Sequence, residues 1–181
     1  MDIEQVRDLS DEDQRVFLLG RVASETTRMD AALRMLHAAL RGEHSVDAFL
    51  DAPNFVSTLV KECRSLLSAY GELDEGALRA VRRTLTDASA AYSRRNRFMH
   101  DMLRADLLTR EWQLAGLVRR ADGEQPVEPT RFDNMVGLVC DLVGVTWRVR
   151  GAAFYVHNRS WQGSALGAVT GQWDGSAEYL G

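Results

Sequence analysis

Residues 10–42, SDEDQRVFLLGRVASETTRMDAALRMLHAALRG, decide the fold class because they have the pattern of one long amphipathic helix. Ser10 followed by three acidic residues is typical of a helix start, where a side-chain oxygen accepts from free backbone amides. Apolar positions then recur at alternating steps of four and three, the period of one helix face: Val22, Thr26, Met29, Leu33, Leu36 and Leu40. Gly42 is placed to end this helix.

The same period predicts three further helices. A helix opening at Pro53 and ending at Gly71 would bury Phe55, Leu59, Cys63, Leu66 and Tyr70; a helix capped by Asp74 would bury Leu78, Val81, Leu85, Ala88 and Tyr92. Residues 133–156 predict the last helix, in which glycines at 137, 144 and 151 would let another helix approach closely. The short stretch 46–50 is half-helical, and residues 106–125 predict a short β-hairpin with a strand at 112–118 and a turn at 122–123.

These elements predict an all-α fold, an antiparallel bundle of four to five helices. We expect the bundle to span residues 1–157, followed by a Gly-, Ser- and Trp-containing tail at 158–181 that is partly disordered. The acidic N-terminus does not have the pattern of a signal peptide, and no apolar run approaches the roughly 18 residues that span a bilayer. The sequence therefore predicts a cytoplasmic protein that does not enter a membrane.

Charge excludes a protein that is basic overall, since 22 Lys and Arg oppose 26 Asp and Glu for a net charge of −4. The segment 79–120, however, holds ten arginines against four acids and is net +6, which leaves −10 on the rest of the chain. Such a segment is either an anion-binding surface or a solvated helix face. The two cysteines, Cys63 and Cys140, are far apart, so neither a disulfide framework nor a zinc-ligand pair is predicted.

The motif that suggests chemistry is RNRFMH, residues 95–100, at the end of the third long helix. Asn96 and His100 are four residues apart and share a face if the helix continues, whereas Arg95 is rotated from His100 by about 140°. Arginine matches phosphate oxygens with its planar fork, and histidine moves protons near neutral pH. Arg95 and His100 would meet on one phosphate through the length of the arginine or a change of winding near Phe98. Those two groups suffice, in principle, to cleave RNA through attack of the ribose 2′-hydroxyl.

RNRFMH resembles the signature of HEPN-domain proteins: Arg, a polar residue, three variable positions and His. The resemblance implies a bundle of four or five helices, usually dimeric, in which two motifs meet across the interface. Many members are metal-independent endoribonucleases of toxin–antitoxin or phage-defence systems. By resemblance, His100 is the proton-transfer residue, Arg95 binds phosphate and Asn96 is the polar positioning residue. The resemblance also implies that the substrate is RNA and that no cofactor is required. An antitoxin or a nucleotidyltransferase is a candidate partner. Asp101, directly after the motif, is able to orient the imidazole, raise its pKa or cap a turn.

Three flanking arginines, Arg94, Arg97 and Arg104, are candidate RNA-binding residues or solubilising surface charges. Phe98 and Met99 are expected to make core or dimer contacts. Of the other histidines, we expect His37 to be a partly buried packing residue, His44 to lie in a turn, and His157 to have no catalytic role.

Three hypotheses follow. The first is a HEPN-type endoribonuclease that acts as a homodimer and leaves a 2′,3′-cyclic phosphate and a 5′-hydroxyl. The second is a non-catalytic HEPN-like module that binds RNA, nucleotide or protein. The third is a structural bundle in which the motif arose by accident.

Overall fold

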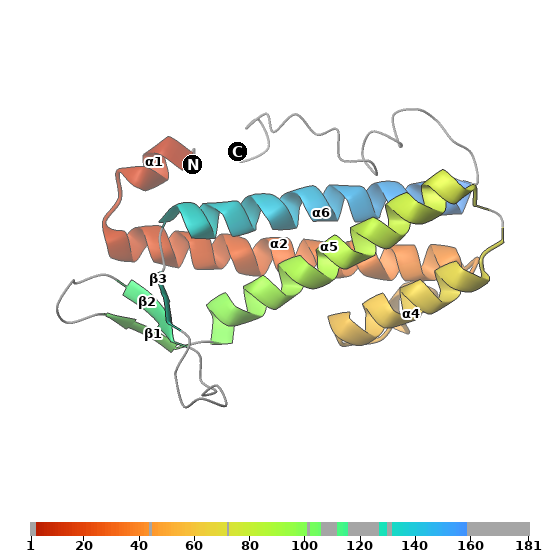
Figure 1. Ribbon diagram of the computed structural model, residues 1–181, viewed down its shortest axis with the longest axis horizontal. Coiled ribbons are helices and arrows are strands. Elements are labelled where there is room, and N and C mark those ends of the chain that lie inside the picture. Colours follow the sequence, from red (N-terminus) through yellow and green to blue (C-terminus); the bar gives the residue numbers. More distant parts are fainter. Residues whose placement is uncertain are drawn as a thin grey trace.

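The computed structural model is a bundle of helices with a small sheet at one end (Figure 1). It describes residues 3–43, 45–71, 73–100, 102–105, 112–115, 127–129 and 132–158. The described elements are, in chain order, α1 (Ile3–Arg7), α2 (Asp11–Leu40), α3 (Val46–Leu50), α4 (Val56–Ala69), α5 (Glu75–His100), β1 (Met102–Ala105), β2 (Trp112–Ala115), β3 (Val127–Pro129) and α6 (Phe132–Asn158). The predicted all-α bundle is confirmed. No helix of the described ranges is both long enough and apolar enough to cross a membrane.

Helix α2 begins and ends where its sequence predicts. The Ser10 hydroxyl oxygen accepts a hydrogen bond from the backbone N–H of Asp13 at 3.2 Å, which satisfies one of the free amides of the first turn. The helix ends at Leu40, and Gly42 has a φ of +71°, a conformation that glycine adopts without strain. All six residues of the predicted stripe from Val22 to Leu40 are buried.

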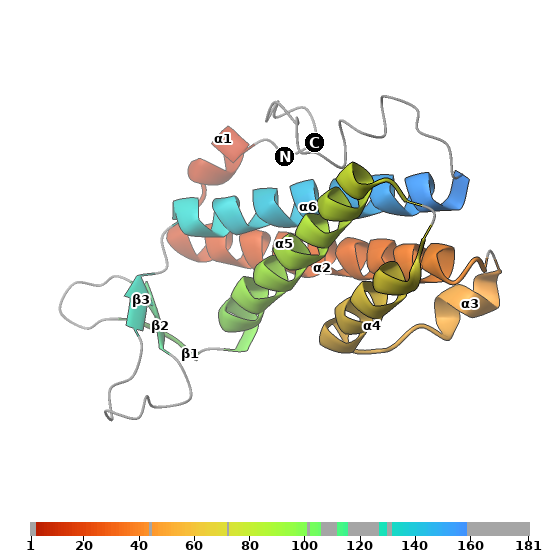
Figure 2. The ribbon, with the colours of Figure 1, turned by 45° about the vertical axis from the view of Figure 1, so that its right-hand side comes forward.

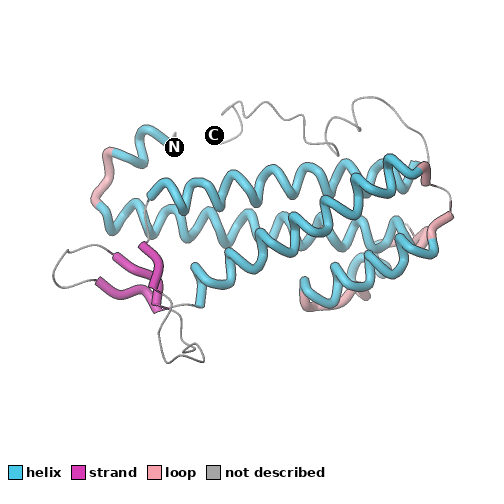
Figure 3. Tube along the Cα trace, in the orientation of Figure 1, coloured by secondary structure: helices cyan, strands magenta, loops and turns pink. Residues whose placement is uncertain are grey.

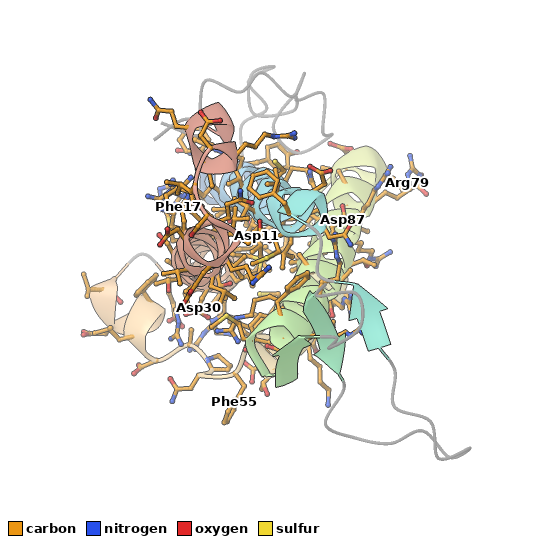
Figure 4. All side chains as sticks on the ribbon, turned by 90° about the vertical axis from the view of Figure 1, so that its left-hand side faces the viewer. Asp11, Phe17, Asp30, Phe55, Arg79 and Asp87 are labelled. Atoms are coloured by element: carbon orange, nitrogen blue, oxygen red, sulfur yellow. The ribbon has the colours of Figure 1, made fainter. Side chains whose placement is uncertain are left out.

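The start of α4 differs from its prediction. Phe55 precedes the first helical residue and is 75% exposed, so it does not join the buried stripe. Leu59 and Cys63 are buried as predicted, Leu66 and Tyr70 are partly buried, and the buried face also includes Val56, Val60 and Leu67. Figure 4 shows the Phe55 side chain pointing away from the bundle.

Helix α5 begins after the predicted cap. The Asp74 carboxylate accepts a hydrogen bond from the backbone N–H of Ala77 at 2.9 Å. That bond is the main cause that lowers the pKa of Asp74; burial opposes the shift, whereas the Gly76 amide, the Tyr155 hydroxyl and Arg79 add to it. Cap and helix dipole therefore both favour the ionised carboxylate at this helix start.

Helices α2 and α6 lie side by side and point the same way (Figures 1 and 2). Arg7, which precedes α2, forms an ion pair at 3.2 Å with Asp133 in the first turn of α6, so both helices begin at the same end. Helix α5 runs antiparallel to α6, because Asp87 pairs with Arg148 at 3.2 Å while the later residue Arg94 pairs with the earlier residue Asp141. The predicted antiparallel arrangement thus holds for α5 and α6, whereas α2 and α6 are parallel.

The core lies between the four long helices. Its largest fully buried side chains are contributed by α2, α4, α5 and α6 and include Leu18, Met29, Leu33, Leu36, Leu59, Leu67, Leu85, Leu138 and Leu142. The predicted close approach of a helix at the glycines of α6 is not found at Gly137, where an added Cβ would meet no atom within 4 Å. At Gly144 such a Cβ would meet only the guanidinium of Arg148, at 3.5 Å.

The strands form one antiparallel sheet in the order β1-β2-β3, between α5 and α6 in the chain (Figure 3). Met102 pairs with Ala115, and Ala115 pairs with Val127 on its other side. Strand β2 lies within the predicted strand 112–118, but its partners β1 and β3 lie outside the predicted hairpin at 106–125. The predicted turn at 122–123 lies outside the described residues. So do His44, Asp101 and the tail after Asn158.

Candidate functional site

The RNRFMH motif occupies the last turns of α5, at the end of the bundle next to the sheet (Figure 1). Helix α5 is α-helical through His100, so Asn96 and His100 lie one turn apart on the same face. A change of winding near Phe98, one of the two routes by which Arg95 was expected to meet His100, is not found. The backbone of His100 belongs to the helix, and its side chain lies outside the described part.

The Arg95 guanidinium contacts two neighbours on its own helix. Its Nη1 donates to the Asn96 Oδ1 at 3.0 Å, and its Cζ lies 5.7 Å from the centroid of the Tyr92 ring. The side chain therefore lies back over the preceding turn, the usual direction for long side chains on a helix, and away from His100. The Nε of Arg95 is buried and has no hydrogen-bond partner among the described residues.

The three flanking arginines differ in environment. Arg94 forms an ion pair with Asp141 of α6, so its charge is compensated. Arg97 is exposed on the surface of α5. Arg104 belongs to β1, which places its backbone near the end of α5, and its side chain lies outside the described part.

A groove of about 340 Å³, lined by both small and charged residues, runs between α5 and α6 on the N-terminal side of the motif. Small residues, among them Ala90, Ala91 and Gly144, form part of its lining. Two ion pairs also line it, Arg94–Asp141 and Arg148–Asp87, and in each helix the acid precedes the arginine by seven residues. In antiparallel helices this spacing brings each acid opposite the other helix's arginine, a signal that the sequence contains and that the sequence analysis missed.

A second, apolar groove of about 290 Å³ lies at the opposite end, between the C-terminal turns of α2 and α6 and helix α3. Exposed apolar side chains line it, including Met35 and Phe154. His157, near the end of α6, is one of its lining residues.

His37 is more deeply buried than expected, with 2% of its side chain exposed. Its Nε2 lies 3.1 Å from the Glu62 Oε2 of α4, and its Nδ1 has no partner among the described residues. Cys63, next to Glu62, is also buried; burial, with a smaller contribution from the Glu62 charge, raises its pKa to about 12. The described ranges contain no cluster of three or more His, Cys, Asp or Glu side chains arranged to hold a metal ion.

Comparison with protein-family models, with curated proteins and with solved structures finds no match to this chain. The resemblance to HEPN proteins therefore depends on the RNRFMH motif and its position in a helical bundle.

Proposed function

We propose that this chain is a metal-independent endoribonuclease of the HEPN type, with Arg95, Asn96 and His100 as its catalytic residues. The single observation that supports this most is the unbroken α5 helix, which keeps Asn96 and His100 on one face at the end of the bundle. Exposed Arg97 adds positive charge at the same end.

In the proposed reaction, His100 accepts the proton of a ribose 2′-hydroxyl. The 2′-oxygen then forms a bond to the adjacent phosphorus, and the bond from phosphorus to the 5′-oxygen breaks. The 5′-oxygen takes up a proton from water and His100 returns its proton to solvent, which leaves a 2′,3′-cyclic phosphate and a 5′-hydroxyl. Arg95 stabilises the negative charge that builds up on the phosphate oxygens, and Asn96 positions the groups.

A composite site formed by two copies of the chain agrees best with the direction of Arg95. Within one copy, the Cα atoms of Arg95 and His100 are about 7.5 Å apart along the helix and about 140° apart around it. A two-fold axis at the end of α5 would bring Arg95 of one copy to His100 of the other. Met99 is 38% exposed at this end and is available as an apolar contact between copies.

The resemblance extends the proposal to a cytoplasmic toxin or defence protein, with an antitoxin or a nucleotidyltransferase as a candidate partner. These biological roles depend on the resemblance alone, and the proposed cleavage chemistry is tested independently of them.

The test is a cleavage assay in which an oligodeoxynucleotide that contains one ribonucleotide is incubated with the full chain in EDTA. We expect one cut, directly 3′ of the ribonucleotide, and a 2′,3′-cyclic phosphate on the upstream product. The all-DNA oligonucleotide should stay intact because it lacks the attacking hydroxyl. Cutting at deoxynucleotides, or activity that EDTA abolishes, would contradict the proposal.

The second candidate function is a non-catalytic module that binds RNA or nucleotide. It is favoured by the engagement of Arg95 with Tyr92 and Asn96 and by the ion pair that compensates Arg94. This function predicts RNA binding that requires Arg95, with no strand cleavage in either EDTA or magnesium.

A further inference from the structure

A group of cations lies on the outer surface where α4 and α5 pack together. We name it the α4/α5 cationic face and define it as Lys61, Arg64, Arg82 and Arg83, all of which are exposed. The Nη2 of Arg64 donates to the Thr86 Oγ1 at 3.3 Å, and that hydroxyl donates in turn to the backbone oxygen of Arg82 at 3.0 Å. The guanidinium of α4 therefore lies beside the turn of α5 that carries Arg82 and Arg83.

None of the four cations forms an ion pair with a carboxylate of the described ranges. The acids nearby in sequence contact other residues. Glu62 contacts His37, Glu75 pairs with Arg79 at 3.0 Å, and Asp87 pairs with Arg148. In Figure 4 the Arg79 side chain, one turn before Arg82, also points away from the bundle. Uncompensated like charges repel one another, so this face gains stability from an anionic partner.

The surface of α5 between this face and the motif contains no unpaired acid among its described side chains. Its exposed positions are the uncharged residues Thr86, Ala90 and Ser93, followed by Arg94, which is paired with Asp141. Exposed Arg97 lies within the motif. From Arg82 to Arg97 the helix rises about 22 Å, which spans several nucleotides of an extended strand. Exposed arginines at 82, 83 and 97 therefore flank a stretch of α5 whose described side chains carry no unpaired negative charge, in a chain whose net charge is −4.

We propose that the α4/α5 cationic face binds the phosphate backbone of single-stranded RNA and leads it to the end of α5. This inference rests on the proposed function and adds the surface that holds the strand away from the cut. A single strand is specified because attack by the 2′-oxygen requires a backbone free to align that oxygen with the leaving 5′-oxygen. Contacts to phosphate carry no sequence preference, so single-stranded DNA should bind the same face.

The experiment measures binding of a fluorescein-labelled 20-nucleotide single-stranded RNA, and of the DNA of the same sequence, by anisotropy across a salt series. Both are bound to the full chain carrying His100→Ala, to prevent cleavage. Adding Arg64→Gln and Arg82→Gln should weaken binding about tenfold and lower the slope of log K against log salt by about 1.4, at about 0.7 per phosphate. The matched control adds Arg7→Gln and Arg41→Gln, which remove the same charge from arginines already paired with Asp133 and Glu43. The affinity of that control variant for RNA should stay within about twofold of the affinity of the His100→Ala chain.

Equal losses in both double variants would show an effect of net charge alone and would overturn the proposal. So would unchanged binding in the Arg64/Arg82 variant, or no binding of either nucleic acid at 50 mM salt. The two proposals fail separately. If the chain binds RNA through this face but never cuts it, the nuclease proposal is refuted and the binding-surface proposal stands. If the chain cuts RNA but binds it normally without Arg64 and Arg82, only the binding-surface proposal is refuted.

Discussion

Replacement of Glu62 by methionine should destabilise the protein although Glu62 is 48% exposed. Its Oε2 is the acceptor for the buried Nε2 of His37, whose Nδ1 already has no partner among the described residues. Removing the carboxylate leaves a second buried ring nitrogen without a hydrogen bond. An unsatisfied buried polar group costs about 1–3 kcal/mol.

The assay is urea and thermal unfolding followed by helical circular dichroism. For a chain of this length, a loss near 2 kcal/mol lowers Tm by about 4–8 °C. Glu62→Gln keeps an oxygen acceptor and should lose less than about 1 kcal/mol. The neighbouring control, Lys61→Met, changes an exposed side chain that has no ion-pair partner among the described residues. Its free energy of unfolding should stay within about 0.5 kcal/mol of the wild type.

A double-mutant cycle isolates the cause. In a His37→Leu background no ring nitrogen remains to be satisfied, so Glu62→Met should then cost less than about 0.5 kcal/mol. The reasoning is refuted if Glu62→Met is as benign as Lys61→Met, or if it costs the same with and without His37.

Asp74→Ala should lower Tm at neutral pH, and the difference should shrink below about pH 4, because a carboxylate of lowered pKa stabilises the fold only while it is ionised; a constant difference down to pH 2 would contradict this. Iodoacetamide at pH 8 should label the half-buried Cys140 well before Cys63, whose pKa is raised further, as read by mass spectrometry, and equal labelling would contradict the burial of Cys63. Asp141→Asn should change the free energy of unfolding by less than about 1 kcal/mol and tighten RNA binding, since it frees Arg94 beside the motif. The control is Asp133→Asn, which frees Arg7 elsewhere, and equal tightening by both variants would contradict a local role for Arg94.

The helices were predictable because each depends on a local period and a local cap. The stripe from Val22 to Leu40 and the caps at Ser10 and Asp74 are found where the sequence places them. Phe55 was misplaced because an apolar residue directly before a helix has the same spacing as one inside it, and only the observed start of α4 at Val56 decides between them.

The direction of the helices and the partners of the arginines depend on tertiary packing, which spacing along one chain does not encode. The parallel course of α2 and α6 depends on the arrangement of the elements between them, which are α3, α4, α5 and the three strands. Likewise, the sequence offers Arg94 as a candidate RNA-binding residue or a solubilising charge and does not indicate its ion pair, because the partner Asp141 is 47 residues away in sequence. The α4/α5 cationic face also combines two helices, so the basic segment 79–120 indicated only half of it.

The most direct test of the account compares single-turnover cleavage of RNA in EDTA by the wild type, His100→Ala and His157→Ala. Loss of a proton-transfer residue should slow cleavage about 10²- to 10⁴-fold, so His100→Ala should be nearly inactive. His157→Ala, an equal change at the far end of α6, should cleave at the wild-type rate. Equal rates for all three proteins would contradict the assignment of the chemistry to the end of α5.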